Sequence, residues 1–244
     1  MILLRSILFL VYLPLTMFVY LVACILFIPF MDKTTPNRIA VYWSRTALWG
    51  LKKIVGLSFE VKGMENIPKD RVYITVANHQ SGMETSAIYS FSPISVYILK
   101  QELLSIPLLG FGLYLTNQIP IKRGDPNSRK NMLKIAKEKV EDGLGISIFP
   151  EGTRIQPGKY VAYKRGAAHL AKDLKLDLLP IAHNCGEFYS KGLKKYPGKA
   201  TFIIGKPIAW NAKEDPRELT ELIQKTVQSA QKEIEGVGPL YNKQ

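Results

Sequence analysis

The feature that most constrains this chain is an uncharged, largely apolar run near its start, from Ser6 to Phe30. About 20 apolar residues, at about 1.5 Å each, are enough for an α-helix to cross the hydrocarbon core of a bilayer. A cleaved signal peptide would share the basic residue Arg5, but its apolar run would be shorter and would end in a small-residue cleavage site. The run therefore predicts an N-terminal hydrophobic membrane helix. Pro14 can kink it, so a single span and a half-immersed helix both remain open.

The next segment, residues 35–56, has the pattern of a basic amphipathic helix that begins with Thr35 as N-cap and Pro36 as its first residue. At about 100° per residue, basic side chains gather on one side and apolar side chains on the other. They are Arg38, Arg45, Lys52 and Lys53 on the basic side, and Ile39, Trp43, Ala47, Leu51 and Ile54 on the apolar side. We favour a helix at an anionic membrane surface over a helix packed on the domain with a solvated basic face. Basic residues here also indicate the cytoplasmic side.

Composition limits what the rest of the chain can be. Its 244 residues, 47% of them hydrophobic and 22% charged, suffice for one globular domain with an appendage and exclude a wholly disordered chain. The two cysteines, Cys24 and Cys185, exclude a disulfide framework and a four-cysteine zinc site. Three widely spaced histidines form no ligand cluster, so we expect no metal. The net charge of +13 suits anionic partners.

From about Leu57 the chain has the sequence pattern of an α/β domain, because short β-forming runs alternate with helical stretches. The expected strands are residues 72–77, 95–99, 118–121, 145–149, 178–182 and 200–204, and the expected helices are 128–141, 166–174 and a last helix after the capping box at 215–218. We predict a mixed sheet flanked by helices. Residues 1–56 would form the anchor and the interfacial helix, and residues 57–244 the globular domain. Ligands of such sheets bind beyond the carboxyl ends of strands.

The first chemically suggestive motif follows the expected strand at 72–77 and contains His79 and Glu84. The histidine can take a proton from a hydroxyl while the carboxylate holds its other nitrogen and stabilises the imidazolium. Five residues correspond to about 140° on a continuous helix, so the pair forms only if His79 lies in the turn and Glu84 in the first helical turn. Ser81 and Glu84 also match a capping box, which would use the carboxylate on a backbone N–H. The spacing leaves both interpretations open.

The second motif, Phe-Pro-Glu-Gly-Thr-Arg at residues 149–154, ends another expected strand. Gly152 allows close backbone approach, Thr153 offers a hydroxyl, and Arg154 can bind an oxyanion through two hydrogen bonds. The motif is a candidate phosphate loop, although it is not a Walker loop. A tight polar turn with a surface arginine fits the spacing equally well.

Four blocks in this order resemble the glycerolipid acyltransferase family, specifically the bacterial 1-acyl-glycerol-3-phosphate acyltransferases. The blocks are Asn-His-Gln-Ser-x-x-Glu at 78–84, Ile-Pro-Ile-Lys-Arg at 119–123, the motif at 149–154 and Leu-Pro-Ile-Ala at 179–182, so the resemblance spans about residues 78–184. The Phe-Pro-Glu-Gly-Thr-Arg string is highly specific. Most members carry Asp where this chain has Glu84, whose side chain is one methylene longer. A subset that resembles this sequence also has Glu followed by Thr.

The resemblance implies transfer of an acyl group from acyl-ACP or acyl-CoA to the sn-2 hydroxyl of 1-acyl-glycerol-3-phosphate, which forms phosphatidic acid in phospholipid biosynthesis. It implies that His79 is the general base, oriented by Glu84, and that the alkoxide attacks the thioester directly. The lack of a Gly-x-Ser-x-Gly nucleophile elbow agrees with that mechanism. The implied acceptor-binding residues are Arg123, Gly152, Thr153 and Arg154, with Glu151 ordering the loop or contacting the acceptor. No cofactor beyond the acyl donor is expected.

The expected partners are a phospholipid bilayer, lysophosphatidate and an acyl carrier protein or CoA thioester, all of them anionic. The expected location is the bacterial inner membrane, with the catalytic domain on its cytoplasmic side. Alternatives are another acceptor such as lyso-ornithine lipid, a thioesterase or lysophospholipase that uses His79, and a non-catalytic basic membrane adaptor. Nucleic acid is not expected, because no nucleic-acid motif accompanies the basic charge. We interpret His169, His183 and Cys185 as packed or incidental residues.

Overall fold

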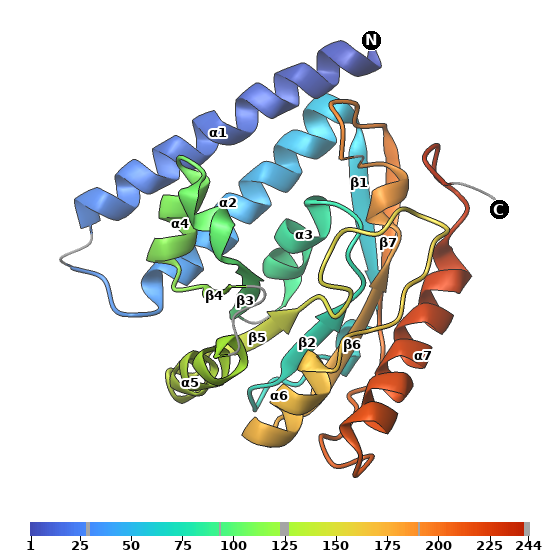
Figure 1. Cartoon of the computed structure of the whole chain (residues 1–244). Coiled ribbons are helices and arrows are strands. Elements are labelled where there is room, and N and C mark those ends of the chain that lie inside the picture. Colours follow the sequence, from blue (N-terminus) through green and yellow to red (C-terminus); the bar gives the residue numbers. More distant parts are fainter. Residues whose placement is uncertain (28–29, 93, 123–126, 190, 242–244) are drawn as a thin grey trace.

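The computed structural model describes residues 1–27, 30–92, 94–122, 127–189 and 191–241. Its seven-stranded sheet has the order β1-β7-β6-β2-β5-β3-β4 (Figure 1). The strands are β1 (Leu57–Lys62), β2 (Ile74–Ala77), β3 (Ser95–Lys100), β4 (Ile119–Ile121), β5 (Gly145–Ile148), β6 (Leu178–His183) and β7 (Gly198–Ile204). β6 and β7 are antiparallel, while the other described pairs are parallel. The predicted mixed sheet is therefore confirmed.

The central strands are continuously apolar because protein covers them on both faces. Every residue of β2 and of β6 is buried. Along β2, Ile74 and Val76 belong to the core on one face of the sheet and Ala77 to the core on the other. β1, at an edge, is absent from the six predicted strands, although its sequence LSFEVK alternates apolar and polar residues as a partly exposed strand does.

Helices cover both faces of the sheet (Figure 1). The elements on one face are α1 (Ile2–Phe27), α2 (Thr35–Gly50), the π-helical turn η2 (Leu51–Val55) and α3 (Met83–Phe91), and those on the other are α5 (Ser128–Glu141), α6 (Gly166–Leu174) and α7 (Pro216–Ile234). The shorter segments are η3 (Met64–Asn66), η4 (Gln101–Ser105), α4 (Leu109–Leu115) and η5 (Cys185–Glu187). The expected bounds of α5 and α6 are confirmed. Asp215 caps α7 by accepting the N–H of Arg217 at 2.7 Å.

The long helix α1 lies along the domain rather than projecting away from it (Figure 1). Near its start, the Ser6 hydroxyl accepts the N–H of Lys195 at 2.8 Å, and near its end Cys24 is buried. In between, Tyr12 donates to the carbonyl of Thr46 at 3.0 Å. The helix continues through Pro14. Among the described residues, α1 is the one helix long and apolar enough to cross a membrane by length and composition.

The start of α2 differs from its expected N-cap at Thr35. The helix begins at Thr35 with Thr34 as N-cap, and the side chain of Asp32 provides the capping bonds. Its Oδ1 accepts the N–H groups of Thr34 and Thr35 at 2.8 and 2.7 Å and also both hydroxyls. These hydrogen bonds, that from the Thr35 hydroxyl foremost, hold the pKa of Asp32 at about 2. A carboxylate at a helix N-terminus is stabilising there.

The interpretation that the apolar side of residues 35–56 faces the membrane is wrong for its centre. Ala47 and Leu51 are buried, because α2 packs between α1 and α3 and the turn η2 joins the core. The basic side chains on the opposite side are exposed, and one of them, Arg45, donates to the carbonyl of Ser90 at 3.2 Å. The apolar side of this helix is thus packed on the domain, and its basic side is exposed.

Candidate active site

A histidine–carboxylate pair is assembled where β2 ends. His79 lies in the turn after the strand and Glu84 in the first turn of α3. His79 Nδ1 and Glu84 Oε1 are 2.8 Å apart. The Glu84 side chain is fully buried, whereas the His79 side chain is 18% exposed.

Glu84 bonds both to His79 and to the N–H of Ser81, so the pair and the backbone bond expected of a capping box do not exclude each other, although Gly82 rather than Ser81 is the N-cap of α3. Glu84 Oε1 also accepts the N–H groups of Gln80 and Ser81 at 2.9 and 2.7 Å, and its Oε2 accepts the hydroxyl of Ser81 in a very short hydrogen bond. Burial alone would raise the pKa of Glu84. The imidazoles of His183 and His79 and the hydrogen bonds from His79 and Ser81 outweigh it and hold the pKa well below its usual range.

The ionised Glu84 fixes the tautomer of His79. A carboxylate can only accept, so Nδ1 of His79 carries the proton and Nε2 carries the lone pair. The ring stacks on Phe149 with centroids 4.2 Å apart, which limits its rotation. His79 is therefore oriented as a base whose reactive nitrogen points away from Glu84.

The 149–154 loop is bonded to the backbone of His79. Glu151 Oε2 accepts the N–H of His79 at 2.8 Å, and the carbonyl of His79 accepts the N–H of Ile155 at 2.8 Å. Glu151 is 8% exposed, and burial raises its pKa to about 8, with the nearby Glu84 adding to the increase. Gly152 has a positive φ of 68°, which favours glycine at this turn. Of the two roles left open for Glu151, its position fits ordering of the loop.

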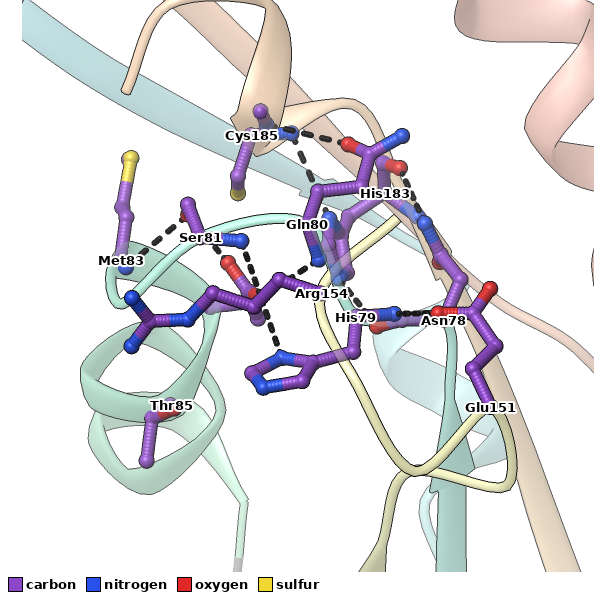
Figure 2. Close-up of polar contacts among 12 residues, drawn as sticks. Asn78, His79, Gln80, Ser81, Met83, Thr85, Glu151, Arg154, His183 and Cys185 are labelled. Carbon is purple, nitrogen blue, oxygen red and sulfur yellow. Dashed lines mark hydrogen bonds and ion pairs between the residues drawn. The ribbon is translucent and has the colours of Figure 1, made fainter. Parts of the chain in front are cut away.

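The two exposed side chains of the loop, Thr153 and Arg154, lie on the outside of this framework. Figure 2 shows Arg154 passing over the catalytic turn toward the start of α3. There, a side chain on Gly82 would come within 3.5 Å of the guanidinium. The Arg154 guanidinium is thus exposed near the start of α3. The expected site residue Arg123 lies outside the described residues.

The two neighbours of His79, Asn78 and Gln80, bind a distant segment of the chain that no sequence motif indicates. Asn78 donates to the carbonyl of His183 at 2.9 Å and accepts its N–H at 3.0 Å, and Gln80 accepts the N–H of Gly186 at 3.0 Å. His183 accepts the N–H of Cys185 at Nδ1, so Nε2 donates to the carbonyl of Asn78 at 2.7 Å. Burial lowers the pKa of His183, which favours this neutral form. The interpretation of His183 as a satisfied packed histidine fits, but its partners belong to the site.

Glu84, His183 and Cys185 bring possible metal-ligand atoms within 4.8 Å of one another. The hydrogen bonds described above already use both carboxylate oxygens of Glu84 and both ring nitrogens of His183. Burial raises the pKa of the Cys185 thiol, which disfavours the thiolate that binds metals. The cluster fits a hydrogen-bonded support better than a metal site.

An apolar cavity of about 150 Å³ lies between the N-terminal helices and α3. Its walls come from α1, α2, α3 and α4, and include Leu21, Trp43, Tyr89 and Leu113. Thr85 and Ser86, the two residues after Glu84, also line it. The site therefore combines a histidine base, an exposed cation and an adjacent apolar space.

Comparisons with known proteins agree on one family. Residues 58–184 match the model of the family described as Acyltransferase. The chain is 34% identical to a 1-acyl-sn-glycerol-3-phosphate acyltransferase of Pseudomonas aeruginosa, over 98% of this chain and 93% of the relative. It is 31% identical to the mouse 1-acyl-sn-glycerol-3-phosphate acyltransferase alpha, over 68% of this chain and 60% of the relative.

A solved structure is also similar. The crystal structure of the 1-acyl-sn-glycerophosphate acyltransferase PlsC from Thermotoga maritima superposes with a TM-score of 0.74 at 27% identity. The alignment covers 94% of this chain and 97% of that one, so the likeness includes the N-terminal helices as well as the sheet.

Proposed function

This chain belongs to the acyltransferase family, and we propose that it acylates the sn-2 hydroxyl of 1-acyl-glycerol-3-phosphate to form phosphatidic acid. The acyl donor is acyl-ACP or acyl-CoA. The observation that carries the proposal is the buried Glu84 carboxylate 2.8 Å from Nδ1 of His79, at the end of a central strand. That arrangement makes Nε2 a base for a hydroxyl.

The proposed reaction needs no covalent enzyme intermediate. His79 Nε2 takes the proton of the acceptor hydroxyl as its oxygen attacks the thioester carbonyl carbon. Glu84 stabilises the imidazolium that forms, and collapse of the tetrahedral adduct breaks the C–S bond. The thiolate of the donor takes the proton back from His79. An alcohol and a thioester are thereby converted into an ester and a thiol, with the base regenerated.

The surroundings of His79 suit a substrate that is anionic at one end and apolar at the other. Arg154 and Thr153 are exposed on the loop that bonds to the backbone of His79, and they would hold the acceptor phosphate together with Gly152 and Arg123. The cavity behind Glu84 would take an acyl chain, since its lining is mainly apolar. Glu151 would keep the loop in place through its bond to the backbone of His79.

The N-terminal helix would hold this site at the membrane. Large apolar side chains cover the outer side of α1, and basic side chains lie exposed on α2. An apolar stripe with basic residues beside it is typical of proteins that enter one leaflet of an anionic bilayer. We propose that the enzyme acts at the bacterial inner membrane, from its cytoplasmic side.

A panel of acceptors with both donors tests this function. Purified enzyme in mixed micelles would receive labelled acyl-ACP or labelled acyl-CoA with lysophosphatidate or lyso-ornithine lipid. We expect labelled phosphatidate as the main product with at least one donor. Preferential transfer to lyso-ornithine lipid would reassign the acceptor. Release of free fatty acid as the main reaction would identify a thioesterase and contradict the proposal.

A further inference from the structure

The side chains of the two residues that flank His79 bind the same distant segment of the chain. Asn78 bonds to both backbone groups of His183, and Gln80 accepts the N–H of Gly186 (Figure 2). These partners lie in residues 183–187, where β6 ends and η5 follows, a segment that we name the β6–η5 turn. The backbone on either side of His79 is therefore held by one turn, more than 100 residues away along the chain.

The other side of the β6–η5 turn is bound by the C-terminal segment after α7. The carboxylate of Glu187 accepts three successive backbone N–H groups, those of Gly236 at 2.8 Å, Val237 at 2.9 Å and Gly238 at 2.7 Å. The carbonyl of Glu187 accepts the N–H of Leu240 at 3.0 Å. A carboxylate that is fully buried needs such donors, because leaving it unpaired would be costly.

A second side chain of the turn strengthens this attachment. Asn184 donates to the carbonyl of Ile234, the last residue of α7, at 2.8 Å and accepts the N–H of Thr201 in β7 at 2.8 Å. Gly238 has no room for a side chain, because a Cβ there would overlap Glu187. The turn is thus fixed between the catalytic turn on one side and the end of the chain on the other. Glu187 and the 236–238 segment lie beyond the family match at 58–184.

We propose that Glu187 is a positioning residue for the reaction, acting on His79 through the β6–η5 turn and Gln80; this inference rests on the proposed function. The link is geometric. Glu187 holds the turn, Gly186 of that turn holds the Gln80 side chain, and the N–H of Gln80 binds the same Glu84 oxygen that orients His79. Displacement of a catalytic group by about 1 Å can cost about 100-fold in rate.

Glu187→Gln is the direct test. The amide replaces one of the two acceptor oxygens by a donor, which faces either the N–H of Gly236 or those of Val237 and Gly238, so the C-terminal segment should loosen while the size of the side chain is kept. We expect kcat to fall about tenfold and the acceptor KM to stay within about twofold, because substrate contacts are untouched. Glu187→Asp, which keeps the carboxylate, should retain more turnover. The matched control is Glu235→Gln, because that carboxylate bonds to the hydroxyl of Tyr241 instead of to the turn.

Gln80→Met keeps the test informative if Glu187→Gln lowers stability, since it removes only the acceptor for Gly186 and leaves the C-terminal attachment in place. We expect a fall in kcat of the same order, without a change in acceptor KM. The double variant with Glu187→Gln should be little slower than the worse single variant, because both act through one turn. If the two substitutions caused independent structural defects, their fold-losses in kcat would instead multiply.

A substrate-free readout separates this inference from the proposed function. The ¹⁵N chemical shift of His79 Nδ1 senses the hydrogen bond to Glu84. This shift should change in Gln80→Met and Glu187→Gln and should equal the wild-type value in the control Glu235→Gln. Unchanged kcat and resonance in Gln80→Met, or multiplying losses in the double variant, would overturn the inference. If the wild type transfers nothing to lysophosphatidate, the proposed function fails, and the resonance still decides whether Glu187 positions His79.

Discussion

The helix α1 and the strand β6 are both built of apolar residues, but they use them in opposite ways. β6 is buried along its whole length, with protein on both faces. α1 buries only a narrow stripe that includes Ser6, Phe9 and Cys24. Its outer side carries large exposed side chains, among them Leu4, Leu8, Val11, Leu15, Phe18, Val22 and Ile25. An apolar run therefore does not reveal whether protein or lipid covers it, whereas the pattern of burial along the run does.

The same contrast holds for polar groups. In α1 the buried polar group is the Ser6 hydroxyl, and it serves to attach the helix to the domain. At the end of β2 the buried polar groups orient a histidine. The first region is built for attachment and the second for chemistry, so damage to one should leave the other largely intact.

The largest effect should come from His79→Ala. Loss of the base should lower turnover by about 10³-fold or more, and vesicle binding and the melting temperature should stay near wild type. Steady-state transfer to lysophosphatidate measures the first quantity, and vesicle sedimentation the second. His169→Ala, at a histidine of α6, is the control and should stay near wild-type turnover. Near-normal turnover in His79→Ala would show that the histidine at the end of β2 does not carry the chemistry.

The next largest effect is expected from polar substitutions on the outer side of α1. Leu15→Ser combined with Phe18→Ser should lower partition into phosphatidylethanolamine–phosphatidylglycerol vesicles at least about tenfold, because burying each such side chain contributes about 1.5–3 kcal/mol. The melting temperature in detergent should not change, since both residues are exposed. Undiminished vesicle binding would show that α1 is not the membrane contact.

Phe9→Ala is the matched control for these substitutions. Phe9 lies on the inner side of the same helix, is 2% exposed, and packs edge-on against Tyr189. Its loss should destabilise the fold by about 3–5 kcal/mol. The two sides of α1 should thus respond in different assays. An equal loss of stability from the outer variants would contradict the orientation of the helix.

Arg154→Ala should have a smaller and more selective effect. We expect the acceptor KM to rise about tenfold with kcat much less affected, because the arginine holds the acceptor phosphate in the proposed mechanism. Arg217→Ala is the control, since this arginine is also exposed but pairs with Glu221 on α7. An unchanged acceptor KM in Arg154→Ala would argue against the phosphate role.

The last prediction concerns Glu151 and the pH dependence of stability. The pKa of Glu151 is raised from 4.5 to about 8 in the fold. Its contribution to stability is therefore complete below its ordinary pKa and is lost as the pH rises through about 8. Glu151→Gln cannot ionise and keeps an acceptor for the N–H of His79. Between about pH 5 and pH 9 its melting temperature should fall less than that of wild type, by about 2–4 °C for each kcal/mol retained. Parallel pH profiles would contradict this assignment.

Local sequence signals predicted much of the fold. The Asp215 cap and the bounds of α5 and α6 follow from capping chemistry and helical spacing, which involve residues close together in the chain. The environment of α2 does not follow from such local signals. The sequence favours a membrane surface for its apolar side, whereas the contacts with α1 and α3 bury that side against the domain. Asp32 was missed as the cap because it lies three residues before the helix.

The candidate site divides in the same manner. The sequence motif indicates both the pair of His79 and Glu84 and a bond from Glu84 to a backbone N–H. In the structure one carboxylate makes both contacts, so the two interpretations are compatible. The attachment of Asn78 and Gln80 to residues 183–187 joins distant segments, so no local pattern indicates it. Glu187 likewise gains its donors from the far end of the chain.

The central claim is direct acyl transfer from a thioester to a lyso-lipid hydroxyl by the base His79. Incubation of the enzyme with a labelled acyl thioester, with and without lysophosphatidate, tests it most directly. We predict that label appears at the sn-2 position of phosphatidate, that almost no fatty acid is released without the acceptor, and that no label stays on the protein. Acceptor-independent hydrolysis as the dominant reaction, or a labelled acyl-enzyme, would contradict the account.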